Sequence, residues 1–259
     1  TQVHKGINKM ATRYSPKITT RGLTFLLDPM NPRCVEAGDT HCVDLVGGKR
    51  CSGANGSPGT GAHTESTSNF PALEKETSTN NSSHVFYFTG SRGINIDEDL
   101  GSHTACTAGM WLYKTSTGGT YMFDFRNNGG NWWLNNYNNH NINIHETMRY
   151  LFPAAAVDGY NADDFPINVW IHLMITSDSS GSKIYLNGRE RTAAHSTSAN
   201  ENFGINARIG TRYTTSGGHV GTMGPIYLYN KVLTAAEVKQ NFLAHVGRYE
   251  ANLCPESSF

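Results

Sequence analysis

The sequence has no excess of either charge: 21 Lys and Arg side chains are balanced by 21 Asp and Glu side chains in 259 residues. Nucleic acids and acidic membrane surfaces attract basic proteins, so this balance argues against both as partners. No apolar run approaches the length of a bilayer span, and no charged-then-apolar secretory leader precedes the first strand. We therefore expect no membrane insertion, and the start at Thr1 favours synthesis in a cytoplasm.

Cysteine is scarce. The chain has five: Cys34, Cys42, Cys51, Cys106 and Cys254. An odd number leaves at least one thiol unbridged in a monomer. The first three lie close together in the sequence, so a disulfide or a metal clip among them is one alternative. No C-x-x-C pair occurs, however, and zinc would need a fourth ligand such as His41. We favour unbridged thiols, because cytoplasmic proteins seldom keep disulfides.

The abundant residues are those of short strands joined by turns. Glycine contributes 27 residues, and Ser, Thr and Asn are frequent. Apolar and polar residues alternate in about a dozen segments, of which Leu23–Leu27 and Val220–Tyr229 are clear examples. A helix is predicted where Thr234 and Glu237 form a capping box before Val238, and it should end near residue 247. The pattern predicts an all-β, two-sheet antiparallel sandwich with one short C-terminal helix.

A long tract rich in Gly, Ser and Thr interrupts this pattern between Gly47 and Ser83. It includes "GGKRCSGANGSPGTGAHTEST", which has almost no apolar side chain to bury. We therefore expect a surface loop with little regular structure, or an excursion that binds a partner.

Several stretches resemble the concanavalin A-like (laminin G-type) jelly-roll module. They are "FYFTGSRGINI" (86–96), "TACTAGMWLYKTS" (104–116), "NVWIHLMITSDSSGSKIYLNGRE" (168–190) and "IYLYNKVLTAAEVKQNF" (226–242). A further stretch, "SPKITTRGLTFLLDPMNP" (15–32), is similar to the opening of the version found in tailed-phage virion proteins. The matches follow one another in the family's order and cover nearly the whole chain.

The resemblance implies one concanavalin A-like jelly-roll domain over residues 15–249. Residues 1–14 are polar without a sustained period, which is typical of an N-terminal arm, and residues 250–259 form a C-terminal tail. It further implies a virion structural protein on the particle surface, as capsid decoration, neck or tail component, and made in the host cytoplasm. Other virion proteins are then the partners, and we expect a homo-oligomer on the particle. The alternative is an adhesin module that recognises host surface glycan.

The same family contains glucanases, so catalysis needs a test. Its retaining glycosidases place two acids on one strand, as E-x-D-x-x-E or E-x-D-x-E, since the two carboxyl groups must be about 5–5.5 Å apart. No such string occurs. The adjacent Asp97, Glu98 and Asp99 face alternate sides, and both the G-x-S-x-G and H-E-x-x-H motifs are absent. We expect a protein without catalytic residues.

The stretch from Asn127 to Asn143 combines three large aromatic residues with nine asparagines. Sugars stack their C–H faces on aromatic rings and pair their hydroxyls with amides, so this composition fits a glycan site. Alternation places Trp133, Asn135 and Tyr137 on one strand face, without saying which face meets solvent. These three and Asn139 are our candidate carbohydrate-binding residues. The alternative is that one Trp belongs to the core and that the asparagines fill turns.

Metal binding has weaker support. Asp124 with Asn127 could contribute to a calcium site, because calcium prefers carboxylate and amide oxygens, but ordinary turn capping explains both residues as well. We expect no other cofactor. Trp111 and Trp170 match core positions of the family, and His172 is expected to be a hydrogen-bonded core histidine.

Overall fold

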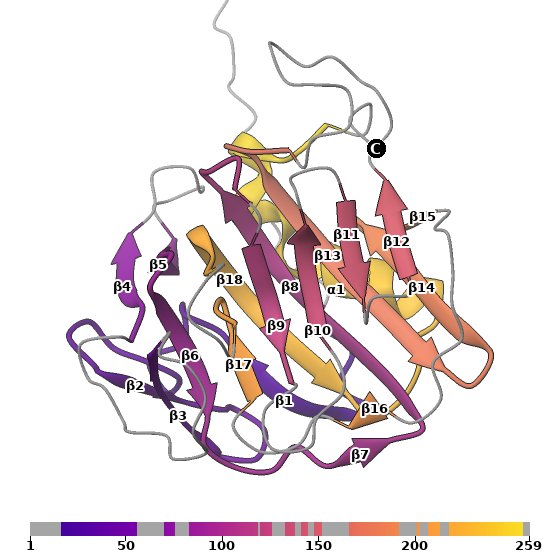
Figure 1. The fold of residues 1–259 in the computed structure, drawn as a ribbon, viewed down its shortest axis with the longest axis horizontal. Coiled ribbons are helices and arrows are strands. Elements are labelled where there is room, and N and C mark those ends of the chain that lie inside the picture. The colour runs from indigo at the N-terminus through magenta and orange to yellow at the C-terminus, as the bar shows by residue number, and fades with distance from the viewer. Residues whose placement is uncertain are drawn as a thin grey trace, which may run out of the picture.

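A computed structural model describes residues 17–55, 70–75, 83–118, 120–125, 133–137, 141–144, 148–151, 166–191, 201–202, 207–212 and 218–255. Two eight-stranded antiparallel sheets, A and B, lie face to face, and the helix α1 (Ala235–Tyr249) covers the back of sheet A (Figure 1). This arrangement confirms the predicted all-β sandwich with one C-terminal helix. None of the described helices is long and apolar enough to cross a membrane.

Sheet A has the strand order β15-β14-β13-β8-β18-β5-β4, and β1 also pairs with β18. Its strands are β1 (Leu23–Leu27), β4 (Ala72–Lys75), β5 (His84–Thr89), β8 (Ala105–Lys114), β13 (Trp170–Asp178), β14 (Gly181–Leu186), β15 (Arg189–Arg191) and β18 (Val220–Tyr229). The register of β18 against β8 shifts between Met223 and Ile226, so the first part of β18 pairs with β5 and the second with β1. The Asn187–Gly188 turn has positive φ at both residues, as the two-residue hairpin requires.

Sheet B has the order β12-β11-β10-β9-β17-β6-β3-β2. Its strands are β2 (His41–Val43), β3 (Arg50–Asn55), β6 (Arg92–Ile96), β9 (Thr120–Asp124), β10 (Trp133–Tyr137), β11 (Asn141–Ile144), β12 (Met148–Leu151) and β17 (Ala207–Ile209). A separate two-stranded sheet joins β7 (Ser102–His103) to β16 (Glu201–Asn202). One face of sheet B packs against sheet A, and its other face, which we call the outer face, is turned toward the viewer in Figure 1.

Two apolar layers hold the fold together. The inner one fills the space between the sheets, where Phe25, Phe86, Phe123 and Ile209 are fully buried. The outer one lies between sheet A and α1 and includes Trp111, Trp170, Tyr227, Tyr229 and Val238. Burial of this area, at about 25 cal/mol per Å² of apolar surface, is the main stabilising term for both layers.

The helix begins and docks as its sequence predicts. Thr234 caps it and forms the reciprocal capping box with Glu237, and Val238 is buried. Arg248, in the last turn, makes a bidentate salt bridge of 2.9–3.1 Å with Asp28, which follows β1. The helix continues to Tyr249, two residues beyond the predicted end. Asp28 and Arg248 thus tie the two ends of the described chain to each other.

The prediction of a surface loop with little regular structure over Gly47–Ser83 is wrong in two places. Arg50–Asn55 forms β3, which pairs on both sides with β2 and β6, and Ala72–Lys75 forms β4 at the end of sheet A. The small residues of β3 suit this position because the strands pack tightly there. A Cβ added at Gly93, opposite Ala54, would lie only 3.2 Å from the Ala54 Cβ. The N-terminal arm, residues 1–14, lies outside the described residues.

Candidate functional site

A row of polar residues crosses the outer face of sheet B. The register pairs Ser52 with Asn95, Asn95 with Arg208, and Arg208 with Asp124, so one residue from each of β3, β6, β17 and β9 lies side by side. On its other side, Asp124 is paired with Trp133 of β10. The series of polar residues therefore ends at Asp124. We call Ser52, Asn95, Arg208 and Asp124 the polar row.

The polar row faces away from the apolar core. The neighbouring rows consist of core residues, with Ile96 and Ala207 on one side and Ile94, Ile209 and Phe123 on the other. Successive residues of a strand point to opposite faces, so the row between them belongs to the outer face. Its four side chains are nonetheless 0–7% exposed. The row is therefore a desolvated polar cluster, in which electrostatic interactions are stronger than in water.

Hydrogen bonds and one charge pair stabilise the polar row. Asp97, just after β6, accepts a hydrogen bond from Ser52 Oγ at 2.7 Å and one from Asn95 Nδ2 at 2.8 Å through the same oxygen. Burial lowers the pKa of the Arg208 guanidinium, and the Asp124 carboxylate opposes this shift. Arg208 also donates from Nη1 to the carbonyl oxygen of Arg212 at 3.0 Å. The row thus fixes the backbone of the segment that follows β17.

This anchored segment brings a guanidinium over an aromatic ring. The Arg212 guanidinium carbon lies 5.3 Å from the centre of the Tyr121 ring, a cation–π distance, and both side chains are half-buried. Tyr121 is the register partner of Asn135 in β10. An aromatic ring, a guanidinium and the strand β10 therefore meet beside the polar row. We call Tyr121, Arg212, β10 and the polar row the candidate face.

The structure locates most of the predicted site residues. Trp133, Asn135 and Tyr137 all lie in β10, as expected, and the residue between the first two, Leu134, is fully buried. Only the backbones of Trp133, Asn135 and Tyr137 belong to the described structure, and Asn139 lies outside the described residues. Their sugar-binding role stays a prediction.

Of the two predicted calcium ligands, only Asp124 belongs to the described residues. Asp124 is buried and lies opposite Arg208, whereas Asn127 lies outside the described residues. Within the described part of the chain, no group of three or more His, Cys, Asp or Glu side chains is placed to hold a metal ion. A role of Asp124 in calcium binding stays a prediction; in the structure its carboxylate lies opposite Arg208 and favours the charged form of that guanidinium.

Tyr121, Arg208 and Arg212 were missed from the sequence. The two arginines lie more than eighty residues from Tyr121 along the chain, and sheet pairing alone brings them to it. The alternation in Thr120–Asp124 was the one local indication that Tyr121 and Asp124 belong to a strand.

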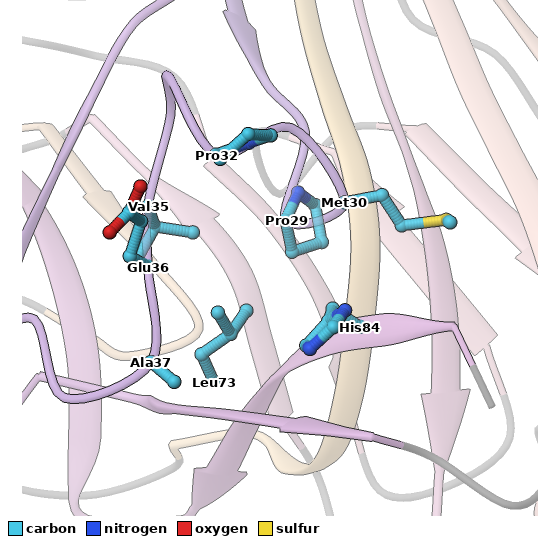
Figure 2. Close-up of a pocket in the computed structure, with 8 residues that line it drawn as sticks. All are labelled: Pro29, Met30, Pro32, Val35, Glu36, Ala37, Leu73 and His84. Carbon is cyan, nitrogen blue, oxygen red and sulfur yellow. The ribbon is translucent and has the colours of Figure 1, made fainter.

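A hollow lies at the end of sheet A, between the loop after β1 and strands β4 and β5. Its volume is about 310 Å³, and it is lined mainly by Pro29, Met30, Pro32, Val35 and Leu73. Figure 2 shows the loop after β1 on one side of this pocket, with Leu73 and His84 on the other. Such a lining offers few hydrogen-bond partners for sugar hydroxyls, so the pocket suits apolar groups better than glycan.

The core assignments are confirmed with one correction. Trp111 and Trp170 are fully buried under α1. His172 is also fully buried, but neither of its ring nitrogens has a hydrogen-bond partner among the described residues, so for this part of the chain the expectation of a hydrogen-bonded histidine is wrong. Its ring packs against Trp111 and Phe242, with centroid distances of 5.0 and 5.8 Å, and burial lowers its pKa to about 3. The ring is held as a neutral, largely apolar group.

Comparison with known proteins supports the architecture. Residues 88–239, more than half of the chain, match the model of the family described as the concanavalin A-like lectin/glucanases superfamily. The match runs from the end of β5 into α1 and includes Tyr121, Asp124, Arg208 and Arg212. No curated protein matches the chain.

Solved structures share the fold at low sequence identity. Domain 4 of AbnA, a GH43 extracellular arabinanase from Geobacillus stearothermophilus solved with arabinotriose, is 16% identical, with a TM-score of 0.54, and the alignment covers 86% of this chain and 98% of that domain. Trypanosoma rangeli sialidase in complex with the inhibitor DANA is 12% identical, with a TM-score of 0.51 and coverage of 87% and 33%. The present chain thus spans about a third of the sialidase.

Proposed function

The chain belongs to the concanavalin A-like lectin/glucanases superfamily, and from this premise we propose that it is a non-catalytic glycan-binding module on the exterior of a tailed-phage particle. The candidate face of sheet B is the proposed binding surface. The observation that carries the proposal is the meeting of Tyr121, Arg212 and the Trp- and Asn-containing strand β10 beside a buried polar row.

The chemistry of this face suits a sugar. An aromatic ring offers a surface for sugar C–H groups, while guanidinium and amide groups offer hydrogen bonds to hydroxyls. Tyr121 and Arg212 are half-buried residues, so part of each residue is accessible to solvent. Arg208 holds the Arg212 backbone in place, which lowers the entropic cost of ordering the surface on binding. The polar row is thus the support of the surface, and Tyr121, Arg212 and β10 are its contacts.

Two features support the absence of catalysis on this face. The carboxylates described there already have partners: Asp97 accepts hydrogen bonds from Ser52 and Asn95, and Asp124 lies opposite Arg208. Asp97 and Asp124 are also separated by the whole of β17. Two strand spacings of about 4.8 Å, together with the two-residue offset of Asp97, place their Cα atoms roughly 12 Å apart. Each Asp carboxyl group reaches only about 2.5 Å from its Cα, so the two groups cannot come within the roughly 5–5.5 Å that a retaining pair needs.

The virion location is supported by residues 15–32, whose sequence resembles the opening of the module in tailed-phage virion proteins. The described part of this segment is built into the domain. The amide of Thr19 donates to Asn241 Oδ1 at 2.8 Å, its carbonyl accepts from the Tyr229 hydroxyl at 3.0 Å, and Asp28 binds Arg248. The resembling segment therefore serves as a brace between β1 and α1.

A purely structural role in the particle is the second candidate. The apolar pocket of Figure 2 favours it, because Met30 at its rim is 40% exposed and apolar hollows suit protein partners. In this case the protein would contact other virion proteins, or further copies of itself, through the end of sheet A.

A glycan array separates the two candidates. We expect the full chain to bind a defined set of glycans, and Tyr121→Ala, Arg212→Ala and Trp133→Ala each to weaken this binding at least tenfold. Tyr87→Ala and Arg189→Ala change matched residue types on sheet A and should bind as the wild type does. Incubation with the bound glycan should release no reducing ends.

Two outcomes contradict the proposal. Silence on the array, with stable assembly only beside virion partners, would favour the structural role. Release of reducing ends from the bound glycan would show catalysis. Imaging of the intact particle tests the virion location separately, since it shows whether copies lie on the exterior.

A further inference from the structure

Three cysteines meet at the edge of sheet B. Cys42 of β2 and Cys51 of β3 are register partners, and Cys34 lies in the loop before β2. The pKa of the Cys42 thiol is raised by its burial and, to a smaller extent, by the neighbouring thiols of Cys34 and Cys51. All three side chains are 0–2% exposed. None of the five cysteines, all of which lie within the described residues, forms a disulfide in the structure.

The backbone between Cys42 and Cys51 has the dimensions of a disulfide. Directly opposite residues in an antiparallel pair have Cα atoms about 4.5–5.5 Å apart, and disulfides span about 4.4–6.8 Å. Strand pairing therefore holds these two cysteines at bridging distance before any oxidation. Cys34 has no such register partner; its carbonyl accepts a hydrogen bond from the amide of Val43.

The location of β2 provides access. This strand has three residues and pairs only with β3 among the described strands, so it is the edge of sheet B. Short edge strands open locally at a lower free-energy cost than central strands. While β2 is closed, the Cys42 thiol is unreactive, because burial raises its pKa and thiolates are the reactive species. Opening of β2 exposes Cys42 and Cys51 together.

We propose that Cys42 and Cys51 form a redox-sensitive disulfide site, which closes when the protein meets a small-molecule disulfide oxidant. The thiolate of one cysteine attacks a sulfur of the oxidant, forms a mixed disulfide and expels one small thiolate. The thiolate of the second cysteine then attacks the protein sulfur of this mixed disulfide and expels the other small thiolate. The protein loses two protons and two electrons, and the oxidant takes them up and leaves as two thiols.

The bridge would fix one end of the polar row. Cys51 immediately precedes Ser52, and the Ser52 hydroxyl donates to Asp97. Once β2 is covalently joined to β3, the edge next to Ser52 no longer opens. A disulfide that closes a loop of about ten residues should raise the thermal midpoint of a protein of this size by roughly 5 °C. Oxidation is therefore expected to stabilise the domain without rebuilding the sheet.

The test uses the full chain with oxidised glutathione, alkylation of the remaining thiols, and trypsin digestion with mass spectrometry. Cleavage after Arg33, Lys49 and Arg50 leaves Cys34 and Cys42 in one peptide and Cys51 in the next. A Cys42–Cys51 bridge therefore joins two peptides, whereas a Cys34–Cys42 bridge stays within one. We expect the joined pair, a higher thermal midpoint for the oxidised protein, and full reversal by dithiothreitol.

Three variants complete the test. Cys42→Ser should lose the bridge, and its circular dichroism spectrum shows whether it is folded. Cys34→Ser should keep the bridge, which excludes a Cys34–Cys51 link between the same two peptides. Cys106→Ser is a matched control, since it replaces a buried cysteine on sheet A, and it should keep the bridge.

Four results in the wild-type chain would overturn the assignment, whatever the variants do. They are alkylation of all five thiols after oxidation, a glutathione adduct that never resolves, a bridge within the peptide that holds Cys34 and Cys42, and a bridge that involves Cys106 or Cys254.

Discussion

Three buried histidines predict that the domain loses stability between pH 8 and pH 5. His172 of β13 and His219, just before β18, are fully buried, and His245 of α1 is 8% exposed. Burial lowers the pKa of His172 and His245 to about 3 and that of His219 to about 4. Neighbouring positive charge adds to the effect, from Arg248 beside His245 and from Lys114 beside His219. All three imidazoles are neutral in the folded protein at pH 5.

The size of the effect follows from proton linkage. An unfolded chain titrates histidine near pH 6.5, so between about pH 6.5 and pH 4 the unfolded state binds more protons than the folded state. The free energy of unfolding is therefore not reduced by these histidines well above pH 6.5, and it falls as the pH falls through this window. At pH 5 each histidine removes about 2 kcal/mol, since one pKa unit is worth about 1.4 kcal/mol. Three histidines remove about 6 kcal/mol, compared with a total of about 5–15 kcal/mol for a typical domain.

Urea unfolding followed by tryptophan fluorescence at pH 8, 6 and 5 measures this loss. The variant His172→Phe keeps a ring beside Trp111 and Phe242 but removes one titrating group, so about a third of the loss should disappear. His172→Phe should gain stability relative to the wild type most clearly at pH 5. Equal unfolding free energies at pH 8 and pH 5 in the wild type would refute the reasoning, as would an unchanged pH dependence in His172→Phe.

Three further sets of variants test individual contacts by urea unfolding at pH 8. Thr234→Ala removes the helix cap and should cost about 1 kcal/mol; no loss would mean that the capping box contributes nothing. Gly247→Ala lies in the exposed last turn of α1 with open space around it, so it should raise the free energy of unfolding by roughly 0.5–1 kcal/mol. Gly109→Ala should be strongly destabilising, because its Cβ would lie 2.8 Å from the Leu173 carbonyl oxygen. The opposite order would contradict the packing. Arg208→Ala removes the guanidinium opposite the buried Asp124 and should cost about 3–5 kcal/mol. Arg208→Met combined with Asp124→Leu should restore most of this loss, whereas equal losses in both proteins would argue against an electrostatic coupling of the two residues.

The parts of the fold that could be predicted from the sequence are those specified by local pattern. Val220–Tyr229 alternates, and Thr234 and Glu237 lie at the spacing of a capping box, so the bounds of β18 and the start of α1 match the structure. The Asn187–Gly188 turn is equally local, because both residues tolerate positive φ. Each of these features depends on residues within a few positions of one another.

The parts that could not be predicted depend on pairing between distant segments. β3 consists of small and polar residues that are typical of a loop, and only its two partners make it a strand. The polar row takes one residue from each of four strands between Ser52 and Arg208, so no window of the sequence contains it. The ring of His172 packs against Trp111 and Phe242, which lie far from it in the sequence, and it has no hydrogen-bond partner in the described part of the chain. The sequence placed Trp133 in a strand, but it did not predict which residue of the adjacent strand lies opposite Trp133.

The most direct test of glycan binding by sheet B is a nuclear magnetic resonance titration. The isotope-labelled full chain is titrated with the glycan that gives the strongest array response, and shifts are mapped onto assigned groups. The account predicts the largest changes at Tyr121, at Arg212 and at the Trp133 indole, with smaller changes along the polar row. Shifts centred on Met30 and Leu73 in the apolar pocket, or on α1, would contradict it.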